Sequence, residues 1–359
     1  MSSTYAINAT NAETCPVIQP VKPKSLVHPG GVFDPAKISA LKKLDATTAS
    51  ALLKITPLDY KPLAIVNVNI GPYGSGDGHK EFIGDGEMSY KAAVAYLVTG
   101  NEAYAELATN IFDAWATKCI TFQGANAPLE AAWGTAAMVK AAELLKYTWP
   151  GWGATGVEAR YNKWLDALIL PYLVKPLGWD NRNNWGLSIC EARLMIALFR
   201  DKNPAYAAPG VTLPSKAGQY VAADEFLWAQ AEYQRIHAGY VAPTGQNGEY
   251  TRDYYHSAFS TGSLIQIPEI LWHQGIDLYS YRNSLMYTSL EFNALPLLGK
   301  TPANAVGQTK DVWYLPCGWH IGYKHYNGRK GLPMPNTAAV IQKNPRDVFT
   351  FHWGLGHLV

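Results

Sequence analysis

Six side chains that carry charge or exchange protons lie within eight residues of one short stretch. They are Glu249, Arg252, Asp253, Tyr254, Tyr255 and His256. Tyrosine and histidine act as general acids and bases, and arginine pairs with anionic groups. The residues that follow, as far as Tyr281, are mostly apolar and have a helical pattern. The sequence therefore predicts proton-transfer chemistry at the mouth of a core helix.

The spacing within this stretch allows two interpretations. If a helix begins near Asp253, then Arg252 and His256 lie four residues apart on one face and can serve one site. The structural alternative is that Arg252 forms a salt bridge with Glu249 or Asp253. In that case His256 is an ordinary core histidine.

A second polar cluster, residues 180–186, leads into another predicted helix. Asn183 and Asn184 are neutral donors at its start, where backbone N–H groups and the helix dipole also favour an anion. A carboxylate can bind there, with Trp185 beside it. The alternative is that the asparagines only cap the helix.

Two further segments carry candidate residues. His237 ends a predicted helix shortly before the main cluster, so it is either a second titrating group or a partner of the helix dipole. Residues 323–335 are polar, aromatic and basic, and they include His325, Tyr326 and Arg329. This segment suits the binding of an acidic polymer, or it is an exposed loop.

The helical period recurs along most of the chain and predicts an all-α fold. A helix capped by Asp34 is expected through Leu53, residues 71–79 form a loop, and a helical hairpin turns at residues 99–101. Further helices are expected at 85–98, 104–115, 133–147, 157–173, 184–201, 224–237, 256–274 and 281–298. Closure of these hairpins into an α/α toroid buries every inner face. We expect an extended arm at 1–28 and a single toroid domain at 29–359.

Composition excludes several classes of protein. The 30 basic and 28 acidic residues are interspersed, so no nucleic-acid-binding stripe is predicted. The 12 Trp and 22 Tyr suit either a sugar-binding groove or a helical core. The four cysteines lie far apart, and Cys119 and Cys190 are predicted to be buried free thiols. Metal-binding and serine-nucleophile motifs are absent, so we expect no metal and no cofactor.

Targeting signals give little information. No apolar run is long enough to span a membrane, and the first residues lack the pattern of a signal peptide. The tripeptide Asn8-Ala9-Thr10 is a glycosylation sequon and is compatible with secretion. No obligate protein partner is indicated.

The ordered motifs resemble one family. Gly248-Glu249-Tyr-Thr-Arg252-Asp253-Tyr-Tyr-His256, followed by residues 270–279, is similar to the Glu-x-x-Arg-Asp-x-x-His and Trp-x-Gln-Gly-Asp-Leu-Tyr run of the alginate-lyase superfamily. The likeness is to the uronan lyases of polysaccharide lyase family 38 and, more distantly, to the family 5 alginate lyases. Residues 85–115, 183–188, 323–335 and 354–358 resemble the family in the same order.

This resemblance implies an incomplete α/α toroid that cleaves a β-1,4-linked uronic-acid polymer by metal-independent β-elimination. It implies that Asn184 and Arg252, helped by His237, neutralise the substrate carboxylate. Tyr255 or Tyr254 then serves as base and acid, or His256 or His237 is the base in a two-residue version. Glu249, Asn183 and the C-terminal segment would contact the polymer, and the enzyme would work outside the cytoplasm.

Two departures from the family pattern bear on these roles. Tyr254 and Tyr255 stand where the family often has Gln-Gly, and Trp185 stands where family 5 alginate lyases have a histidine. Two rival functions also stay open. A glycoside hydrolase on the same fold would use two carboxylates from among Glu249, Asp253 and Asp85, and a non-catalytic carbohydrate-binding protein would use the aromatic residues alone.

Overall fold

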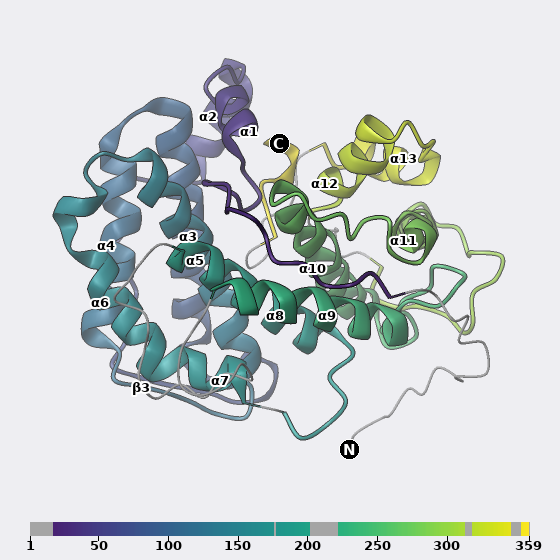
Figure 1. The fold of residues 1–359 in the computed structure, drawn as a ribbon, viewed down its shortest axis with the longest axis horizontal. Helices are drawn as coiled ribbons and strands as arrows, with labels where there is room; N and C mark the ends of the chain where they lie inside the picture. The colour runs from purple at the N-terminus through teal and green to yellow at the C-terminus, as the bar shows by residue number, and fades with distance from the viewer. Residues whose placement is uncertain (1–16, 176, 202–221, 313–317, 346–352, 359) are drawn as a thin grey trace.

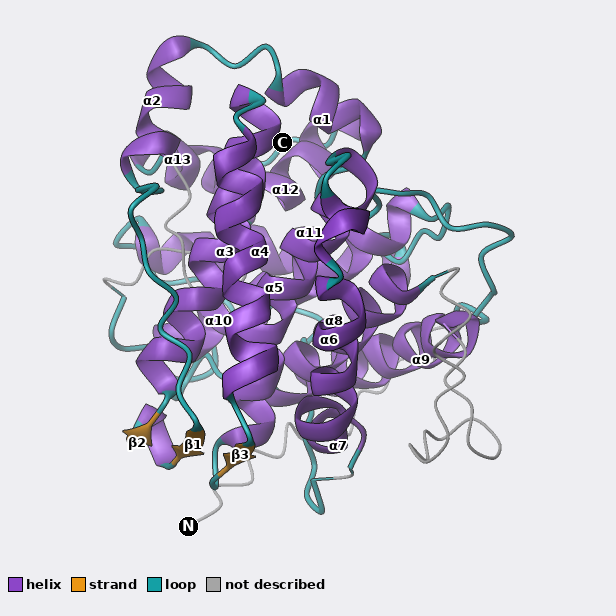
Figure 2. Cartoon of the chain, turned by 90° about the vertical axis from the view of Figure 1, so that its left-hand side faces the viewer, coloured by secondary structure: helices purple, strands orange, loops and turns teal. Residues whose placement is uncertain are grey.

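The protein is built almost wholly from helices, with one small sheet at one end (Figures 1 and 2). The computed structural model describes residues 17–175, 177–201, 222–312, 318–345 and 353–358. Its long helices are α3 (His79–Thr99), α4 (Glu102–Lys118), α5 (Ala127–Thr148), α8 (Asn184–Arg200), α9 (Ala222–Tyr240), α10 (Tyr254–His273) and α11 (Tyr281–Leu297). Its shorter helices are α1 (Pro35–Leu41), α2 (Ala46–Lys54), α6 (Val157–Trp164), α7 (Leu170–Val174), α12 (Trp319–Tyr323) and α13 (Pro335–Lys343).

The helices pack as hairpins around a shared core. Helix α3 packs on α4, and α8 packs on α9, while α3, α5, α8 and α10 lie against one another in that order. Helix α10 is buried continuously from Ser257 to Leu271, as expected for a helix in the middle of a large domain. The predicted all-α architecture and the predicted core helix are both confirmed.

Short polar side chains set where the helices begin. Asp34 Oδ1 accepts a hydrogen bond of 2.9 Å from the backbone N of Lys37, which caps α1 as predicted. The single helix expected through Leu53 is wrong, because Asp45 caps a second helix through a 2.9 Å bond from Thr48 N. Gly100, at φ 69°, makes the predicted turn between α3 and α4.

Two helices begin six residues before their predicted starts: α3 at His79 rather than Asp85, and α5 at Ala127 rather than Trp133. The glycines of residues 71–78 obscured the start of α3, because they favour turns and hide the helical period. His79 therefore belongs to a helix rather than to a loop.

A three-stranded sheet holds the loop that precedes α3. Its strands are β1 (Asn67–Ile70), β2 (Gly76–Asp77) and β3 (Thr121–Gln123), in the order β2-β1-β3. Strand β1 pairs antiparallel with β2 and parallel with β3. The sheet ties the loop to the segment just before α5, so the starts of α3 and α5 lie at one end (Figure 2).

Residues 17–28 form no helix or strand and cross α10 to reach α9 (Figure 1). Three glutamine side chains hold them by pairing with both the N–H and the C=O of a backbone residue. The pairs are Gln234 with Ile18, Gln230 with Val21 and Gln274 with Val27, at 2.8 to 3.3 Å. A side-chain amide replaces a neighbouring strand here, so the arm is bonded without a sheet.

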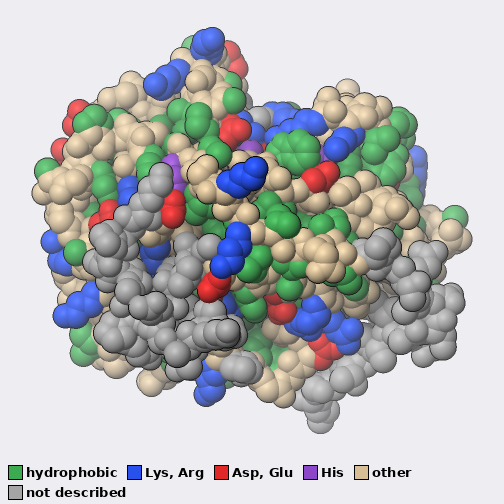
Figure 3. All heavy atoms as spheres, in the orientation of Figure 1, with side chains coloured by type: hydrophobic (Ala, Val, Ile, Leu, Met, Phe, Trp, Pro, Cys, Tyr) green, Lys and Arg blue, Asp and Glu red, His purple; other side chains and the backbone are tan. Residues whose placement is uncertain are grey.

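Three further features of the structure concern surface charge, the cysteines and membrane-spanning helices. On the face shown in Figure 3, basic and acidic side chains are interspersed among the described residues. Cys119 and Cys190 are buried free thiols, as predicted. No helix among the described residues is both long and apolar enough to cross a membrane.

Candidate active site

The first two turns of α3, α5, α8 and α10 meet at a small apolar cluster, called here the aromatic cluster. Its buried members are Ile83, Leu129, Trp133, Phe259 and Trp353, and the half-buried Trp185 and Tyr255 pack against it. Trp185 is the second residue of α8, and Tyr255 is the second residue of α10. The two polar segments singled out in the sequence, about 70 residues apart, therefore lie on one surface. Four helix N-termini beside this surface favour an anionic ligand.

Close ring contacts fix the helices at this cluster. The Trp133 ring lies 5.2 Å from Phe259 and 6.3 Å from Trp353, and Tyr255 lies 4.1 Å from Phe259. The indole Nε1 of Trp133 donates a 2.9 Å hydrogen bond to Ser188 Oγ on α8. Side chains at this end are thus positioned by a packed core, which a catalytic site requires.

Asp253 orients His256. Its carboxylate caps α10 by accepting 2.8 Å from the backbone N of His256, and both of its oxygens lie 2.8 Å from His256 Nδ1. With Nδ1 donating to Asp253, the neutral ring presents Nε2 as an acceptor. His256 is 17% exposed, and its ring meets Tyr255 edge-on at 5.6 Å. This is the geometry of a base held by a carboxylate.

Arg252 lies at the same helix start with its guanidinium 37% exposed. Its Nη1 is 3.4 Å from Glu249 Oε2, and its Nε is 3.8 Å from Asp253 Oδ2. These contacts are long for charge-assisted hydrogen bonds, so the guanidinium retains donors for an incoming anion. Burial raises the pKa of the Glu249 carboxyl, while nearby Arg252 opposes that shift.

The two asparagines of α8 have different surroundings. Asn183 caps the helix, because its Oδ1 accepts a 3.0 Å bond from Trp185 N. Asn184 is 1% exposed, and its Oδ1 has no hydrogen-bond partner among the described residues. A buried polar atom without a partner is unusual and is suited to a ligand or a water molecule.

Trp179 is a further candidate site residue, which the sequence did not indicate. It is 48% exposed and meets the Trp185 ring edge-on at 5.4 Å. Trp185 in turn packs on the aromatic cluster. The pair extends an aromatic surface from the proton-handling residues towards solvent. The one sequence signal for Trp179 is its position in the loop-forming sequence Trp-Asp-Asn, away from any helical apolar pattern.

The structure places His237 and Tyr254 in the core rather than at this surface. His237 is 1% exposed between the rings of Tyr233 and Tyr281, and burial, aided by Arg282, lowers its pKa to about 3. The Tyr254 hydroxyl, on a side chain that is 1% exposed, donates 2.9 Å to Asn293 O. His237 Nδ1, like Asn184 Oδ1, has no hydrogen-bond partner among the described residues. Tyr255 and His256 are the more exposed members of the group.

The C-terminal candidates lie at the other end of α10. Arg329 forms a two-point ion pair with the buried Glu269, at 2.8 and 2.7 Å. His325 stacks on Tyr279 at 3.7 Å, and the Tyr326 hydroxyl donates 2.9 Å to Tyr279 O. At the α-helical rise, Glu269 lies roughly 20 Å further along α10 than His256. The structure therefore does not bring these three residues to the aromatic cluster.

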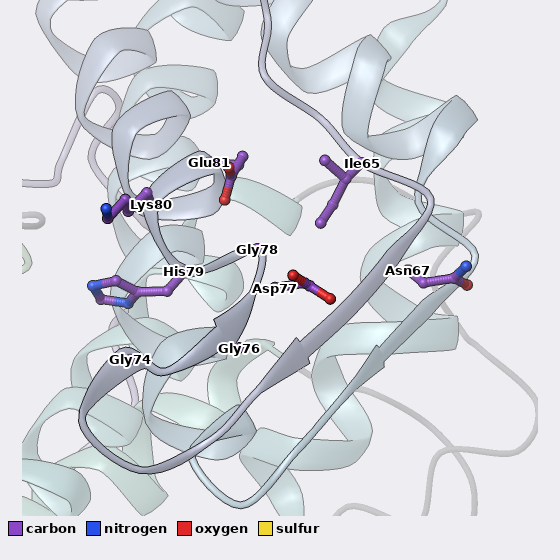
Figure 4. A pocket seen from close by; sticks show the side chains of 9 residues that line it. All are labelled: Ile65, Asn67, Gly74, Gly76, Asp77, Gly78, His79, Lys80 and Glu81. Carbon is purple, nitrogen blue, oxygen red and sulfur yellow. The ribbon is translucent and has the colours of Figure 1, made fainter.

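No group of three or more His, Cys, Asp or Glu residues in the described part of the chain is arranged to hold a metal ion. A pocket of about 620 Å³ opens beside β1, β2 and the start of α3 (Figure 4). Asp77, Lys80 and Glu81 line it, so its charge is mixed. The sequence-predicted site residues are not among its lining.

Comparisons with known proteins give one family match and several similar folds. A family profile described as "Alginate lyase" matches residues 72–292. Alginate lyase A1-III, in the apo form of a variant, is 19% identical with a TM-score of 0.62, covering 94% of this chain and 96% of that chain. The enzyme from Sphingomonas species A1 is 17% identical with a TM-score of 0.59, covering 87% and 92%. An alginate lyase from Bacteroides ovatus is 14% identical with a TM-score of 0.59, covering 93% and 99%.

No curated protein matches the sequence. The structural likenesses confirm the α/α toroid fold, and the family match covers more than half of the chain, including the starts of α3, α5, α8 and α10. The chain belongs to the alginate lyase family and is a polysaccharide lyase.

Proposed function

We propose that this enzyme cleaves a β-1,4-linked uronic-acid polymer, glucuronan or polymannuronate, by metal-independent β-elimination and leaves a 4,5-unsaturated uronate end. Its resemblance to polysaccharide lyase family 38 supports this choice of polymer. The single observation that carries the proposal is the convergence of Trp185 with Tyr255 on the aromatic cluster. This convergence supports assigning carboxylate binding and proton transfer to one surface.

The first requirement of β-elimination is to neutralise the uronate carboxylate, because the C5 proton beside it is otherwise very weakly acidic. Arg252 supplies a positive charge and Asn184 a neutral amide, and both stabilise the enolate that develops on this carboxylate. Protein donors of this kind make a metal ion unnecessary for the step. Two alginate lyase A1-III variants of similar fold bind a tetrasaccharide, which supports an acidic oligosaccharide ligand here.

The second requirement is proton transfer. His256 Nε2, oriented through Asp253, takes the C5 proton, and the electron pair of the C5–H bond moves towards the carboxylate as the enolate. This pair then forms the C4=C5 double bond as the C4–O4 bond breaks, and the Tyr255 hydroxyl gives its proton to O4. In glucuronate and mannuronate the C5 hydrogen and O4 lie on the same side of the ring, so adjacent residues of one helix start can serve both. The alternative assignment uses Tyr255 as base and then as acid.

The hydrolase alternative has less support from the carboxylates. Asp85 is fully buried and accepts hydrogen bonds from Tyr60 Oη, Leu63 N and Trp115 Nε1, at 2.7 to 2.9 Å. Burial raises its pKa to about 6, but it has no access to a polymer. Asp253 is committed to His256. Neither Asp85 nor Asp253 is therefore placed to face another carboxylate across a sugar, which hydrolysis needs.

A screen tests the proposed activity. Purified protein, with and without EDTA, is incubated with glucuronan, polymannuronate, polyguluronate and hyaluronan, and ultraviolet absorbance of the unsaturated product is followed. We expect absorbance with glucuronan or polymannuronate that EDTA does not change. New reducing ends without that absorbance would support hydrolysis, and calorimetric binding without turnover would support a binding protein. Because such polymers do not cross membranes intact, we also propose that the enzyme works outside the cytoplasm.

Trp179→Ala is expected to weaken polymer binding without slowing the chemical step. Loss of one ring-stacking surface costs about 1 kcal/mol, which corresponds to a rise in KM of roughly fivefold. The value of kcat stays within about twofold of the wild type, because Trp179 does not touch the reacting atoms. Steady-state kinetics on the best polymer measure both constants. Trp179→Phe, which keeps a flat ring, should restore most of the affinity, and an unchanged KM for Trp179→Ala would remove this residue from the site.

A further inference from the structure

A second histidine–carboxylate pair lies at the same end of the helices as Asp253 and His256. His79, the first residue of α3, places Nδ1 2.9 Å from Oε2 of Glu130 on α5. The other Glu130 oxygen, Oε1, accepts a 3.0 Å bond from Asn126 Nδ2. The Glu130 side chain is fully buried, whereas the His79 side chain is 27% exposed. A buried carboxylate with both oxygens in use therefore orients a histidine that reaches solvent.

This pair lies on the same helix starts as three members of the aromatic cluster. Ile83, a member of the cluster, follows His79 by one helical turn and so lies on the same face of α3. In the sequence of α5, Glu130 comes between Leu129 and Trp133, which are also members of the cluster. The pair thus lies at the α3–α5 side of the surface whose α8–α10 side carries Trp185 and Tyr255. His79 also lines the pocket beside β1 and β2, and in Figure 4 its ring points away from Asp77 and Ile65 of that pocket.

The loop before α3 limits how the His79 ring can turn. A Cβ atom added to Gly74 would lie 2.8 Å from the ring carbons and 2.9 Å from Nε2. Gly74 has φ +71°, which also favours glycine. The loop therefore touches the ring, while Glu130 holds Nδ1 from the other element. A histidine restrained in this way presents Nε2 in a fixed direction.

We propose that His79, positioned by Glu130, is a further substrate-binding residue, and that its Nε2–H donates to the carboxylate of a uronate ring neighbouring the scissile bond. The inference rests on the uronan-lyase function proposed above and adds a carboxylate-binding subsite to it. A polyuronate carries one carboxylate on every ring, so a site that holds several rings needs more cationic donors than Arg252 alone. Glu130 has the role of a positioning residue.

The charge of His79 follows from its neighbours. The hydrogen bond to Glu130 raises the pKa of His79, burial opposes the shift, Glu81 of α3 adds to it and Lys80 opposes it. Because the pKa is raised, the cationic ring persists to higher pH than a free histidine. Its contribution to affinity is present at lower pH and is lost as pH rises through its pKa. Replacing Glu130 with a neutral residue should move that loss to lower pH.

The test measures binding and turnover of a uronan hexamer by wild type, His79→Gln and Glu130→Gln. Calorimetry should show about tenfold weaker binding for His79→Gln, since a charge-assisted hydrogen bond is lost. The value of kcat should change by less than about threefold. For Glu130→Gln, which still accepts from Nδ1–H, the fall in kcat/KM with rising pH should begin at lower pH. Lys80→Gln, an exposed neighbour of equal charge, is the matched control and should bind like wild type.

A hexamer with its carboxyl groups reduced to alcohols tests whether His79 binds a carboxylate or only supports the loop before α3. Reduction should weaken binding to wild type more than binding to His79→Gln, because the variant has already lost one carboxylate contact. Equal losses in both proteins, with an unchanged pH profile for Glu130→Gln, would overturn the inference and make the pair a clamp for the loop. If wild type makes unsaturated product while His79→Gln binds normally, the inference fails and the proposed function stands. Absence of any uronan binding by wild type would overturn both.

Discussion

His256→Asn is expected to lower kcat on the best uronan by about 10³- to 10⁴-fold, the upper range for loss of a general base. The Asn amide remains within reach of Asp253, so the cap of α10 and the fold are retained, but Nε2 is lost. Binding of a hexamer should change by less than about threefold, because the base contacts the C5 proton rather than the carboxylate. Rapid-mixing absorbance measurements give kcat, and thermal unfolding checks the fold.

A substrate with a good leaving group distinguishes the two assignments of Tyr255. In a uronate dimer analogue with fluoride at C4, departure needs no proton donor. If Tyr255 is only the acid, Tyr255→Phe should eliminate fluoride at a rate within about tenfold of wild type, while polymer cleavage falls by about 10²-fold or more. If both rates collapse together, Tyr255 is the base, and His256 has a supporting role.

Arg252→Ala has the second large expected effect, a fall in kcat/KM of about 10³-fold. Arg252 neutralises charge that grows on the substrate carboxylate as the enolate forms, and loss of one such donor typically costs 10²- to 10³-fold in kcat. Its ground-state ion pair adds a smaller loss in affinity. Arg252→Lys should recover only part of the rate, because an ammonium group lacks the two-point geometry of guanidinium.

A matched control uses an exposed arginine close to the start of α8. Arg182, paired with the exposed Asp180, lies two residues before Asn184 but carries no role in the proposed chemistry. Arg182→Ala should keep kcat within about twofold of wild type. Asn184→Ala should lower kcat by about 10²-fold, since it removes a neutral donor. Normal turnover by both Arg252→Ala and Asn184→Ala would show that the carboxylate is neutralised elsewhere.

Local sequence signals predicted the parts of this fold that depend on neighbouring residues. The helical period located α8 and α10 closely. A helix start near Asp253 was expected, and Asp253 caps α10. Long-range packing was beyond such signals. Nothing in the sequence near Trp133 or Phe259 indicates that these rings join the starts of α5 and α10.

The same limit explains which candidates lie elsewhere. Arg329 follows an exposed-looking polar motif, and only the folded chain shows that Glu269, 60 residues away, occupies its guanidinium. His237 has the sequence of a helix-end titrating group, yet it is buried against the rings of Tyr233 and Tyr281. A polar residue type predicts chemistry only when its exposure is known. His79 is the converse case, a partly exposed residue that the sequence did not single out. The glycines before it hid the start of the helix to which it belongs.

The most direct test of the central claim is the mass of the products from a defined glucuronate or mannuronate hexamer. β-Elimination adds no water, so the masses of each pair of fragments should sum to the mass of the hexamer, with wild type active and His256→Asn nearly inactive. Fragment pairs that together exceed the parent by one water molecule would show hydrolysis and contradict the account.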